Sequence, residues 1–172
     1  MRWMWIDRII ELDPGKRIVT IKNVSLAEEH LHDHFSSTER QAAFPVMPAS
    51  LIVEGMAQTA GILVGHMSAF KEKVVLAKVS KADLAYDVVP GQTITYTAQI
   101  LQAGMAGVST TGTVALRDSG STEAGQQIGT VDLVFSHLDK NMAGEQFPEH
   151  NFVFGESFQT ILATAGISFD LR

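Results

Sequence analysis

Cysteine is absent from the chain of 172 residues, which excludes disulfides, thiolate metal sites and cysteine nucleophiles. Such a composition fits a reducing compartment. Positive charge is also scarce, because 13 lysines and arginines stand against 19 acidic residues, for a net charge of -6. Phosphate binding needs a basic surface, so nucleic acid is disfavoured as the main partner. Residues 1–8 contain no sustained apolar stretch, so we expect no signal peptide and a cytoplasmic location.

An apolar run free of polar groups is missing as well. The longest apolar stretch, residues 49–70, contains Glu54, Gln58 and His66 together with several glycines. Ionisable groups are costly inside a bilayer, so this stretch predicts a helix buried in a globular protein and no membrane span. Hydrophobic residues make up 45% of the chain and charged residues 19%, which is enough for one domain with a real core.

Strand patterns lie on both sides of this helix. Residues 17–24 are rich in β-branched side chains and follow a turn signal at residues 13–15, Asp-Pro-Gly. Further strands are predicted over residues 74–79, 83–88, 93–102, 108–116 and 128–138. Successive strands with short turns favour an antiparallel sheet. We therefore predict an α+β architecture, in which an antiparallel sheet of about five or six strands is wrapped round a long central helix.

Residues 140–172 are predicted to be an extension of a domain that spans residues 1–139. The extension holds five of the nine phenylalanines, namely Phe147, Phe152, Phe154, Phe158 and Phe169. So many aromatic side chains are not expected to stay in water. Phe158, Ile161 and Leu162 have the spacing of one helix face. We expect the extension to pack on the body of the domain; a lid or a contact on a partner subunit is the alternative.

The polar residues that can carry chemistry lie in and just before the long helix. Glu54 is one turn inside it, and Gln58 lies on the same face and could orient Glu54 by a hydrogen bond. A buried carboxyl group resists ionisation and can donate a proton, and His34 can accept one. The first helix amides, near Ala49 and Ser50, lack intrahelical acceptors and could hold a thioester carbonyl. Ser50 or a neighbour could also cap the helix. A structural role for His34 and Glu54 stays open at this point.

A longer motif surrounds these residues. His34-Phe35 and residues 45–58, PVMPASLIVEGMAQ, resemble the signature of the 3-hydroxyacyl-(acyl-carrier-protein) dehydratases. That signature is His-Phe-Pro-Gly-x-Pro-Val-x-Pro-Gly, a few apolar residues, and then Glu-Ala-Met-Ala-Gln. Three other stretches are similar too: residues 6–9, 22–25 and 88–92. The resemblance covers roughly residues 5–138.

The resemblance implies a hot-dog fold and a homodimer, or a higher oligomer built from it, with active sites at the subunit interface. His34 would remove the C2 proton of a 3-hydroxyacyl thioester. Glu54 of the partner subunit would protonate or polarise the departing 3-hydroxyl. The amide of Ala49 or Ser50 would bind the thioester oxygen, and the Val46 carbonyl would orient His34.

The resemblance also bears on product and substrate. The reaction needs no metal and no organic cofactor. Related dehydratase-isomerases carry Asp at the acid position, so Glu54 favours simple dehydration to a trans-2-enoyl thioester. The resemblance places this step in fatty-acid or related acyl-chain biosynthesis, with the acyl group on an acyl carrier protein or on coenzyme A.

This chain departs from the signature at two points. The loop between Phe35 and Pro45 is about six residues longer and lacks the Pro-Gly, which can shift His34 or reshape the tunnel mouth. Ala49 replaces a glycine and adds a methyl group where backbone approaches substrate. The extension after residue 139 is a further difference. Two other functions therefore remain alternatives: a hot-dog acyl thioesterase and a non-catalytic acyl-binding subunit.

Three other patterns were weighed. On a strand, His30, His32 and His34 would share a face that could bind zinc, but no second cluster supports a metal site. A hydrolytic triad of Ser50, His34 and Glu54 lacks the Gly-x-Ser-x-Gly elbow. A basic patch beyond the helix is either a solvated face or a dock for the acidic acyl carrier protein. Its members are Lys71, Lys73, Lys78 and Lys81.

Overall fold

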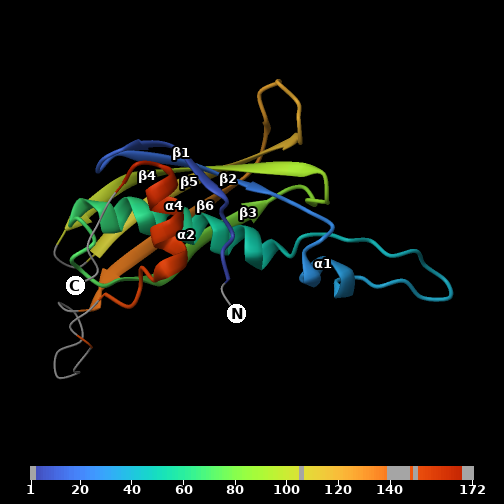
Figure 1. Ribbon diagram of the computed structural model, residues 1–172, viewed down its shortest axis with the longest axis horizontal. Helices are drawn as coiled ribbons and strands as arrows, with labels where there is room; N and C mark the ends of the chain where they lie inside the picture. The colour runs from blue at the N-terminus through green and yellow to red at the C-terminus, as the bar shows by residue number, and fades with distance from the viewer. Residues whose placement is uncertain (1–2, 105–106, 139–147, 149–150, 168–172) are drawn as a thin grey trace.

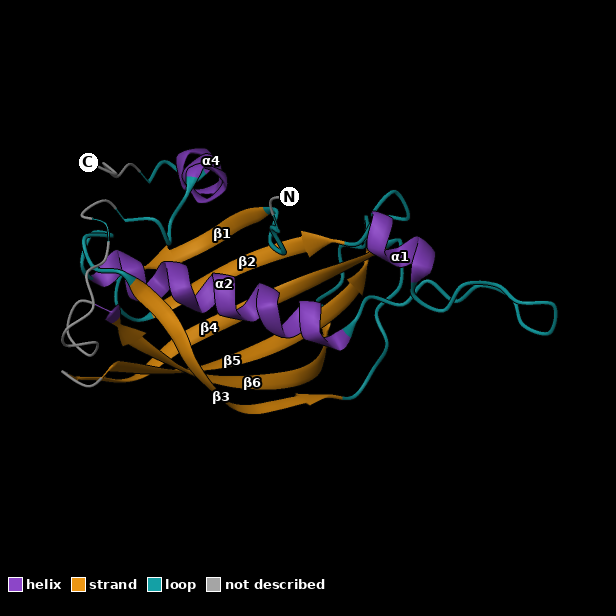
Figure 2. Cartoon of the chain, turned by 90° about the horizontal axis from the view of Figure 1, so that it is seen from below, coloured by secondary structure: helices purple, strands orange, loops and turns teal. Residues whose placement is uncertain are grey.

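A six-stranded antiparallel sheet and one long helix make up the body of the computed structural model, which describes residues 3–104, 107–138, 148 and 151–167, with only the backbone of His32 and Asp33. The strand order is β1-β2-β4-β5-β6-β3. The strands are β1 Arg8–Asp13, β2 Arg17–Asn23, β3 Val74–Leu84, β4 Gln92–Gly104, β5 Gly107–Asp118 and β6 Gln126–His137. Helix α2, Ala49–Met67, lies along one face of the curved sheet (Figures 1 and 2). The predicted α+β hot-dog fold is confirmed.

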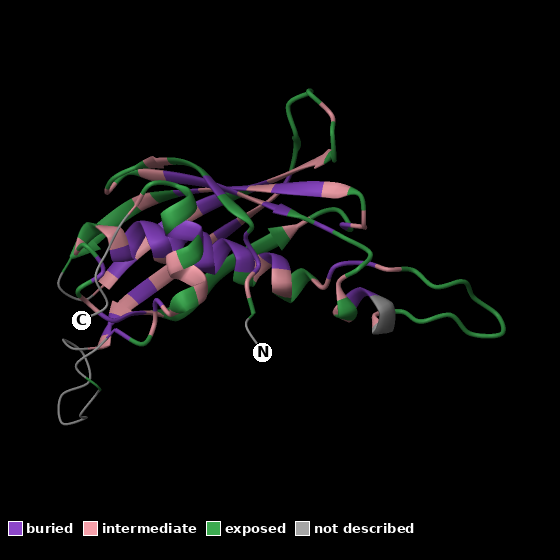
Figure 3. Ribbon diagram, viewed as in Figure 1, coloured by how far each residue is buried: buried purple, intermediate pink, exposed green. Residues whose placement is uncertain are grey.

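The core lies between α2 and the sheet. Side chains of α2 such as Ile52, Met56 and Leu63 are buried. Figure 3 shows buried segments along the α2 ribbon. On β4, Ile94 and Tyr96 are two residues apart, so they lie on the same face of the strand, and both are buried. Burying one such side chain stabilises the fold by about 1.5–3 kcal/mol, so this interface fixes the position of α2 on the sheet.

Gly55 allows α2 to lie close to the sheet. A Cβ atom at Gly55 would be 2.6 Å from Tyr96 Cζ and 2.9 Å from the Trp5 carbonyl oxygen. Only a residue without a side chain avoids these contacts, so this glycine supports close packing on the sheet. Beneath it the Tyr96 ring is fully buried, and burial raises the pKa of the Tyr96 hydroxyl.

Two local predictions were wrong. The sequence suggested strands at residues 74–79 and 83–88, but β3 runs without a break from Val74 to Leu84 and residues 85–88 are not in a strand. Register shifts after Leu76 and after Val79 bulge β3 without ending it. Ser50 does not cap α2, because the N-cap residue is Pro48 and no side chain accepts a capping hydrogen bond there. Ahead of the loop that follows His34, the chain forms the short helix α1, Glu29–Asp33.

The C-terminal residues that the structure describes lie against the body. Helix α4, Glu156–Thr164, contacts β1 (Figure 2). Its Ile161 and Leu162 are buried. Asn151 Nδ2 donates hydrogen bonds to the carbonyl oxygens of Phe70, at 2.7 Å, and Glu72, at 3.1 Å. Phe147 and Phe169 lie outside the described residues. The division into residues 1–139 and 140–172 remains a prediction.

Within the part of the chain that the structure describes, no helix combines the length and the apolar character needed to cross a bilayer.

Candidate active site

His34 is held by the backbone just ahead of α2. Its Nδ1 lies 2.5 Å from the Val46 carbonyl oxygen. A carbonyl oxygen only accepts, so Nδ1 carries the proton and the lone pair resides on Nε2. The ring is half-buried beside Phe35, with 4.3 Å between the ring centroids. This contact between His34 and Val46 is the one expected from the sequence, and it leaves Nε2 able to act as a base.

The longer loop after His34 is closed at its base. The Phe44 amide donates to the Phe35 carbonyl oxygen at 3.0 Å, and the Thr38 amide donates to Gln41 at 2.9 Å. Phe35 adopts a left-handed conformation with φ 57°. Residues 36–43 therefore project from the body as an exposed arm (Figures 1 and 3). The hydrogen bond between Phe35 and Phe44 holds the two ends of the arm together, so the extra residues leave the His34–Val46 contact in place.

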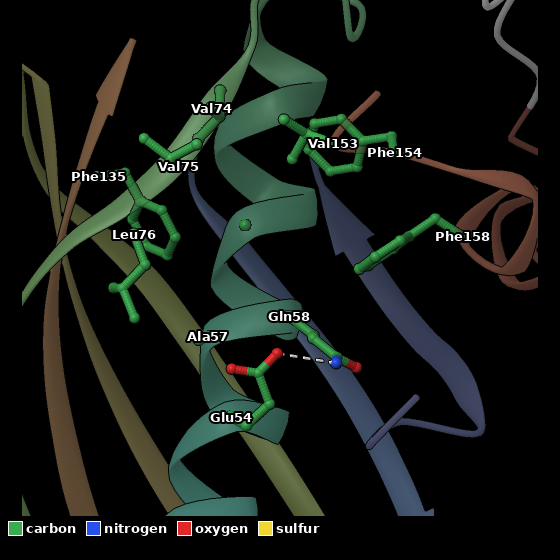
Figure 4. Close-up of a pocket in the computed structure, with 11 residues that line it drawn as sticks. Glu54, Ala57, Gln58, Val74, Val75, Leu76, Phe135, Val153, Phe154 and Phe158 are labelled. Carbon is green, nitrogen blue, oxygen red and sulfur yellow. Dashed lines mark hydrogen bonds between the residues drawn. The ribbon is translucent and has the colours of Figure 1, made fainter. Parts of the chain in front are cut away.

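Glu54 lies on the uncovered face of α2. The sequence predicted a buried carboxyl group; in this chain Glu54 is exposed, because the sheet covers only the opposite face of the helix. Gln58 Nε2 donates to Glu54 Oε1 at 3.0 Å, as the helical spacing suggested (Figure 4). The carboxyl group is thus oriented by its neighbour one turn further along α2.

Gln58 is itself held by the chain ahead of β1, which sequence reasoning missed. Its Oε1 accepts from the Trp5 amide at 2.9 Å, and its Nε2 also donates to the Trp3 carbonyl oxygen at 2.8 Å. Nothing in the composition of residues 3–5 signals these contacts, because they are made by backbone atoms. They fix the amide orientation, so that Nε2 is the group facing Glu54.

The predicted site residues line two different pockets. His34, Val46 and Ala49 line a pocket of about 340 Å³, which also includes Tyr86 and Asp87. A second pocket, of about 260 Å³, is lined by Glu54 and Gln58 with apolar side chains around them (Figure 4). The predicted base and acid of one chain therefore line different pockets.

The start of α2 supplies amides to the first of these pockets. The Pro48 carbonyl oxygen accepts from the amides of Leu51, at 2.9 Å, and Ile52, at 3.3 Å. The amides of Ala49 and Ser50 precede these bonds, and helix geometry gives them no intrahelical acceptor. Ala49 lines the same pocket as His34, whereas Ser50 does not line it. The oxyanion role of these two amides stays a prediction.

The histidines before the arm do not lie on a strand. His30 and His32 belong to α1, and His34 follows it. Residues two apart on a helix face different directions, so the prediction that these histidines share one face of a strand is wrong. His30 instead packs edge-on against Trp5, with 4.9 Å between ring centroids. Burial lowers the pKa of His30, an effect that Glu28 opposes. No group of three or more candidate ligands that could hold a metal ion occurs among the described residues.

The basic patch is smaller than predicted. Lys71, Lys78 and Lys81 are exposed, but Lys73 is buried and does not belong to a solvated surface. Lys73 directly precedes β3, whose first residue, Val74, is buried as well, and this explains its position.

Comparison with known proteins identifies the family. The FabA-like domain matches residues 2–126. The chain belongs to the FabA-like family. A 3-hydroxyacyl-(acyl-carrier-protein) dehydratase FabZ from Clostridium kluyveri is 31% identical over 141 residues, which cover 81% of this chain and 88% of that protein. One from Ruminiclostridium cellulolyticum is 39% identical over 100 residues, which cover 58% of this chain and 66% of that protein. The family predicted from the sequence is thus confirmed.

A solved structure agrees at the level of the fold. The dehydratase heterocomplex ApeI:P from Xenorhabdus doucetiae aligns with a TM-score of 0.55 at 16% identity, over 78% of this chain and 83% of that one. At this identity the likeness supports the hot-dog fold of the FabA-like chain.

Proposed function

We propose that this chain is a hydro-lyase that converts 3-hydroxyacyl thioesters to trans-2-enoyl thioesters. The hydrogen bond from His34 Nδ1 to the Val46 carbonyl carries the proposal, because it leaves Nε2 free as a base beside the first amides of α2. The relatives named as 3-hydroxyacyl-(acyl-carrier-protein) dehydratases confirm the reaction class predicted from the sequence, which belongs to fatty-acid biosynthesis.

The residues divide the reaction between them. His34 Nε2 takes the proton from C2, and the electron pair of that bond moves toward the thioester carbonyl. The amides of Ala49 and Ser50 stabilise the resulting enolate oxygen. The pair then forms the C2–C3 double bond as the C3–O bond breaks, and Glu54 gives its proton to the leaving hydroxyl, which departs as water. Proton return from His34 to Glu54 through solvent resets the site.

A homodimer brings the acid to the base. His34 and Glu54 line different pockets of one chain, and Glu54 is exposed. Strand β3 forms one edge of the sheet and exposes Leu76 and Val79. An exposed apolar edge strand favours pairing with another chain. Pairing across β3 would cover Glu54 and present it to His34 of the partner subunit.

The substrate is an acyl thioester, with the acyl carrier protein as the proposed carrier and coenzyme A as the alternative. The exposed Lys71, Lys78 and Lys81 remain the proposed dock for an acidic carrier protein. A cytoplasmic location remains part of the proposal.

The test is a direct assay with 3-hydroxyacyl thioesters, in which enoyl absorbance and free thiol are followed together. We expect enoyl product from the wild type, and a loss of kcat of about 10²–10⁴-fold in His34→Ala and in Glu54→Gln. Glu39→Gln, an exposed carboxylate on the arm, is the matched control and should retain wild-type turnover.

Each other outcome has a defined meaning. Free thiol without enoyl product would replace the proposal by an acyl thioesterase. Binding of the thioester without any turnover would replace it by an acyl-binding subunit. Full activity in either site variant would reject the assigned roles of His34 and Glu54.

A further inference from the structure

The pocket beside Glu54 has one polar end and an apolar remainder. Glu54, Ala57, Gln58 and Gly61 line it at the spacing of one helix face. At a rise of about 1.5 Å per residue, this stripe is about 10 Å long. The opposite wall comes from apolar residues of β3 and β6, among them Leu76 and Phe135 (Figure 4). Such a lining suits a hydrocarbon chain whose reacting carbons lie near Glu54.

The third wall of this pocket comes from the C-terminal extension. Val153, Phe154 and Phe158 all line the pocket, and Figure 4 shows Phe158 reaching from α4 toward α2. The match to the FabA-like domain ends at residue 126. The wall is therefore built by a part of the chain that lies outside the family match.

Packing and hydrogen bonds hold this wall against α2 and the turn that follows it. The Phe154 ring is buried against Gly65, where a Cβ atom would collide with the ring. It packs edge-on against Phe70, with 5.0 Å between centroids, and against Phe158, with 5.6 Å. Asn151 ties the same segment to the turn after α2. A rigid aromatic wall limits how far an apolar chain can extend.

We propose that the C-terminal extension closes the acyl pocket and that Phe154 and Phe158 limit the length of acyl chain that the enzyme accepts. This inference rests on the proposed function, because it takes Glu54 as the end at which the reaction occurs. It adds what that function leaves open, namely which acyl chains are substrates.

The test compares kcat/KM for 3-hydroxybutanoyl, 3-hydroxyoctanoyl and 3-hydroxydodecanoyl coenzyme A. In Phe158→Ala we expect the ratio of dodecanoyl to butanoyl activity to rise at least about tenfold, because the variant opens space in an apolar pocket. Gly61→Val adds side-chain volume to the floor and should lower the ratio of octanoyl to butanoyl activity. Phe152→Ala is the matched control: Phe152 is an exposed residue of the extension that lines a different pocket, and its removal should leave both ratios unchanged.

A second measurement separates this inference from the proposed function. The affinities of butanoyl, octanoyl and dodecanoyl coenzyme A are measured by calorimetry on Glu54→Gln, with and without Phe158→Ala. A shift toward longer chains supports the inference even if no enoyl product forms. The inference is overturned if Phe158→Ala changes neither the activity ratios nor the affinities and if Gly61→Val, with a wild-type thermal midpoint, leaves its activity ratio unchanged. The dehydratase assignment would then still stand. Phe158→Leu replaces Phe158→Ala if the alanine variant does not fold.

Discussion

One hydrogen bond determines which nitrogen of His34 can accept a proton. The Val46 carbonyl takes the proton-bearing Nδ1, and the ring is thereby oriented as well as set in one tautomer. The acceptor is a backbone atom, so any side chain at position 46 would supply it. The sequence motif therefore identifies His34, but the contact itself depends on how the chain turns between Phe44 and α2.

Gln58 is expected to act as a positioning residue for Glu54. Gln58→Leu keeps the side-chain size and removes the hydrogen bonds to Glu54, Trp3 and Trp5. We expect kcat to fall about tenfold with little change in KM, since a hydrogen bond contributes about 0.5–1.5 kcal/mol net. Steady-state kinetics on the longest accepted thioester measure this split. A purely structural role would lower the thermal midpoint and leave kcat unchanged in the folded protein.

For single residues, the sequence predicts which residues form the site better than it predicts how buried they are. His34, Glu54 and Gln58 were found from motif and spacing, and the expected contacts of His34 with Val46 and of Gln58 with Glu54 are present. The exposure of Glu54 was mispredicted, because an apolar helix sequence does not say which of its faces the sheet covers and which it leaves for another surface.

Two glycines of helix α2, Gly61 and Gly65, have different surroundings, so substitution by alanine should change stability differently at each position. A Cβ atom at Gly65 would collide with the Phe154 ring, whereas one at Gly61 would lie 3.7 Å from Phe135 in ordinary contact. Gly65→Ala should destabilise the fold by about 1–3 kcal/mol, because the added methyl group overpacks the site. Gly61→Ala is the matched control and should be neutral or stabilising by up to about 1 kcal/mol, since alanine favours a helix.

Thermal and urea unfolding of the two variants test this comparison. Equal effects of Gly65→Ala and Gly61→Ala would show that Phe154 does not pack against α2 as described. Limited proteolysis gives a second readout, because release of the C-terminal residues in Gly65→Ala alone would locate the damage in the extension.

The elements were predictable where periodicity is strong. β4 and α2 follow from alternation and from apolar content, and each appears within a few residues of its expected bounds. The continuous β3 was divided in the prediction because its two bulges interrupt the alternation, and a bulge is set by pairing with β6. The place of Phe154 beside Gly65 is a contact between distant segments, which no local pattern encodes.

For the whole molecule, the proposed shared site predicts complementation between two inactive variants. A mixed dimer of His34→Ala and Glu54→Gln contains one site with both wild-type residues. Random pairing of equal amounts should therefore restore about a quarter of wild-type activity. Co-expression of two differently tagged chains, with tandem purification, isolates the mixed dimer, which should show about half of wild-type activity because one of its two sites is intact. Refolded single variants serve as controls, and no recovery in a verified mixed dimer would place both residues in one chain.

The closed base of the arm has a consequence for how this chain can change. Phe35 and Phe44 are joined by a hydrogen bond. A change in the length of residues 36–43 therefore alters the entropic cost of ordering the loop but not the position of His34. Lengthening a loop whose ends are already fixed is inexpensive, with about 0.6 kcal/mol for each doubling. Residues 36–43 are thus a position at which insertions and deletions can accumulate during divergence without passing through an inactive ancestor.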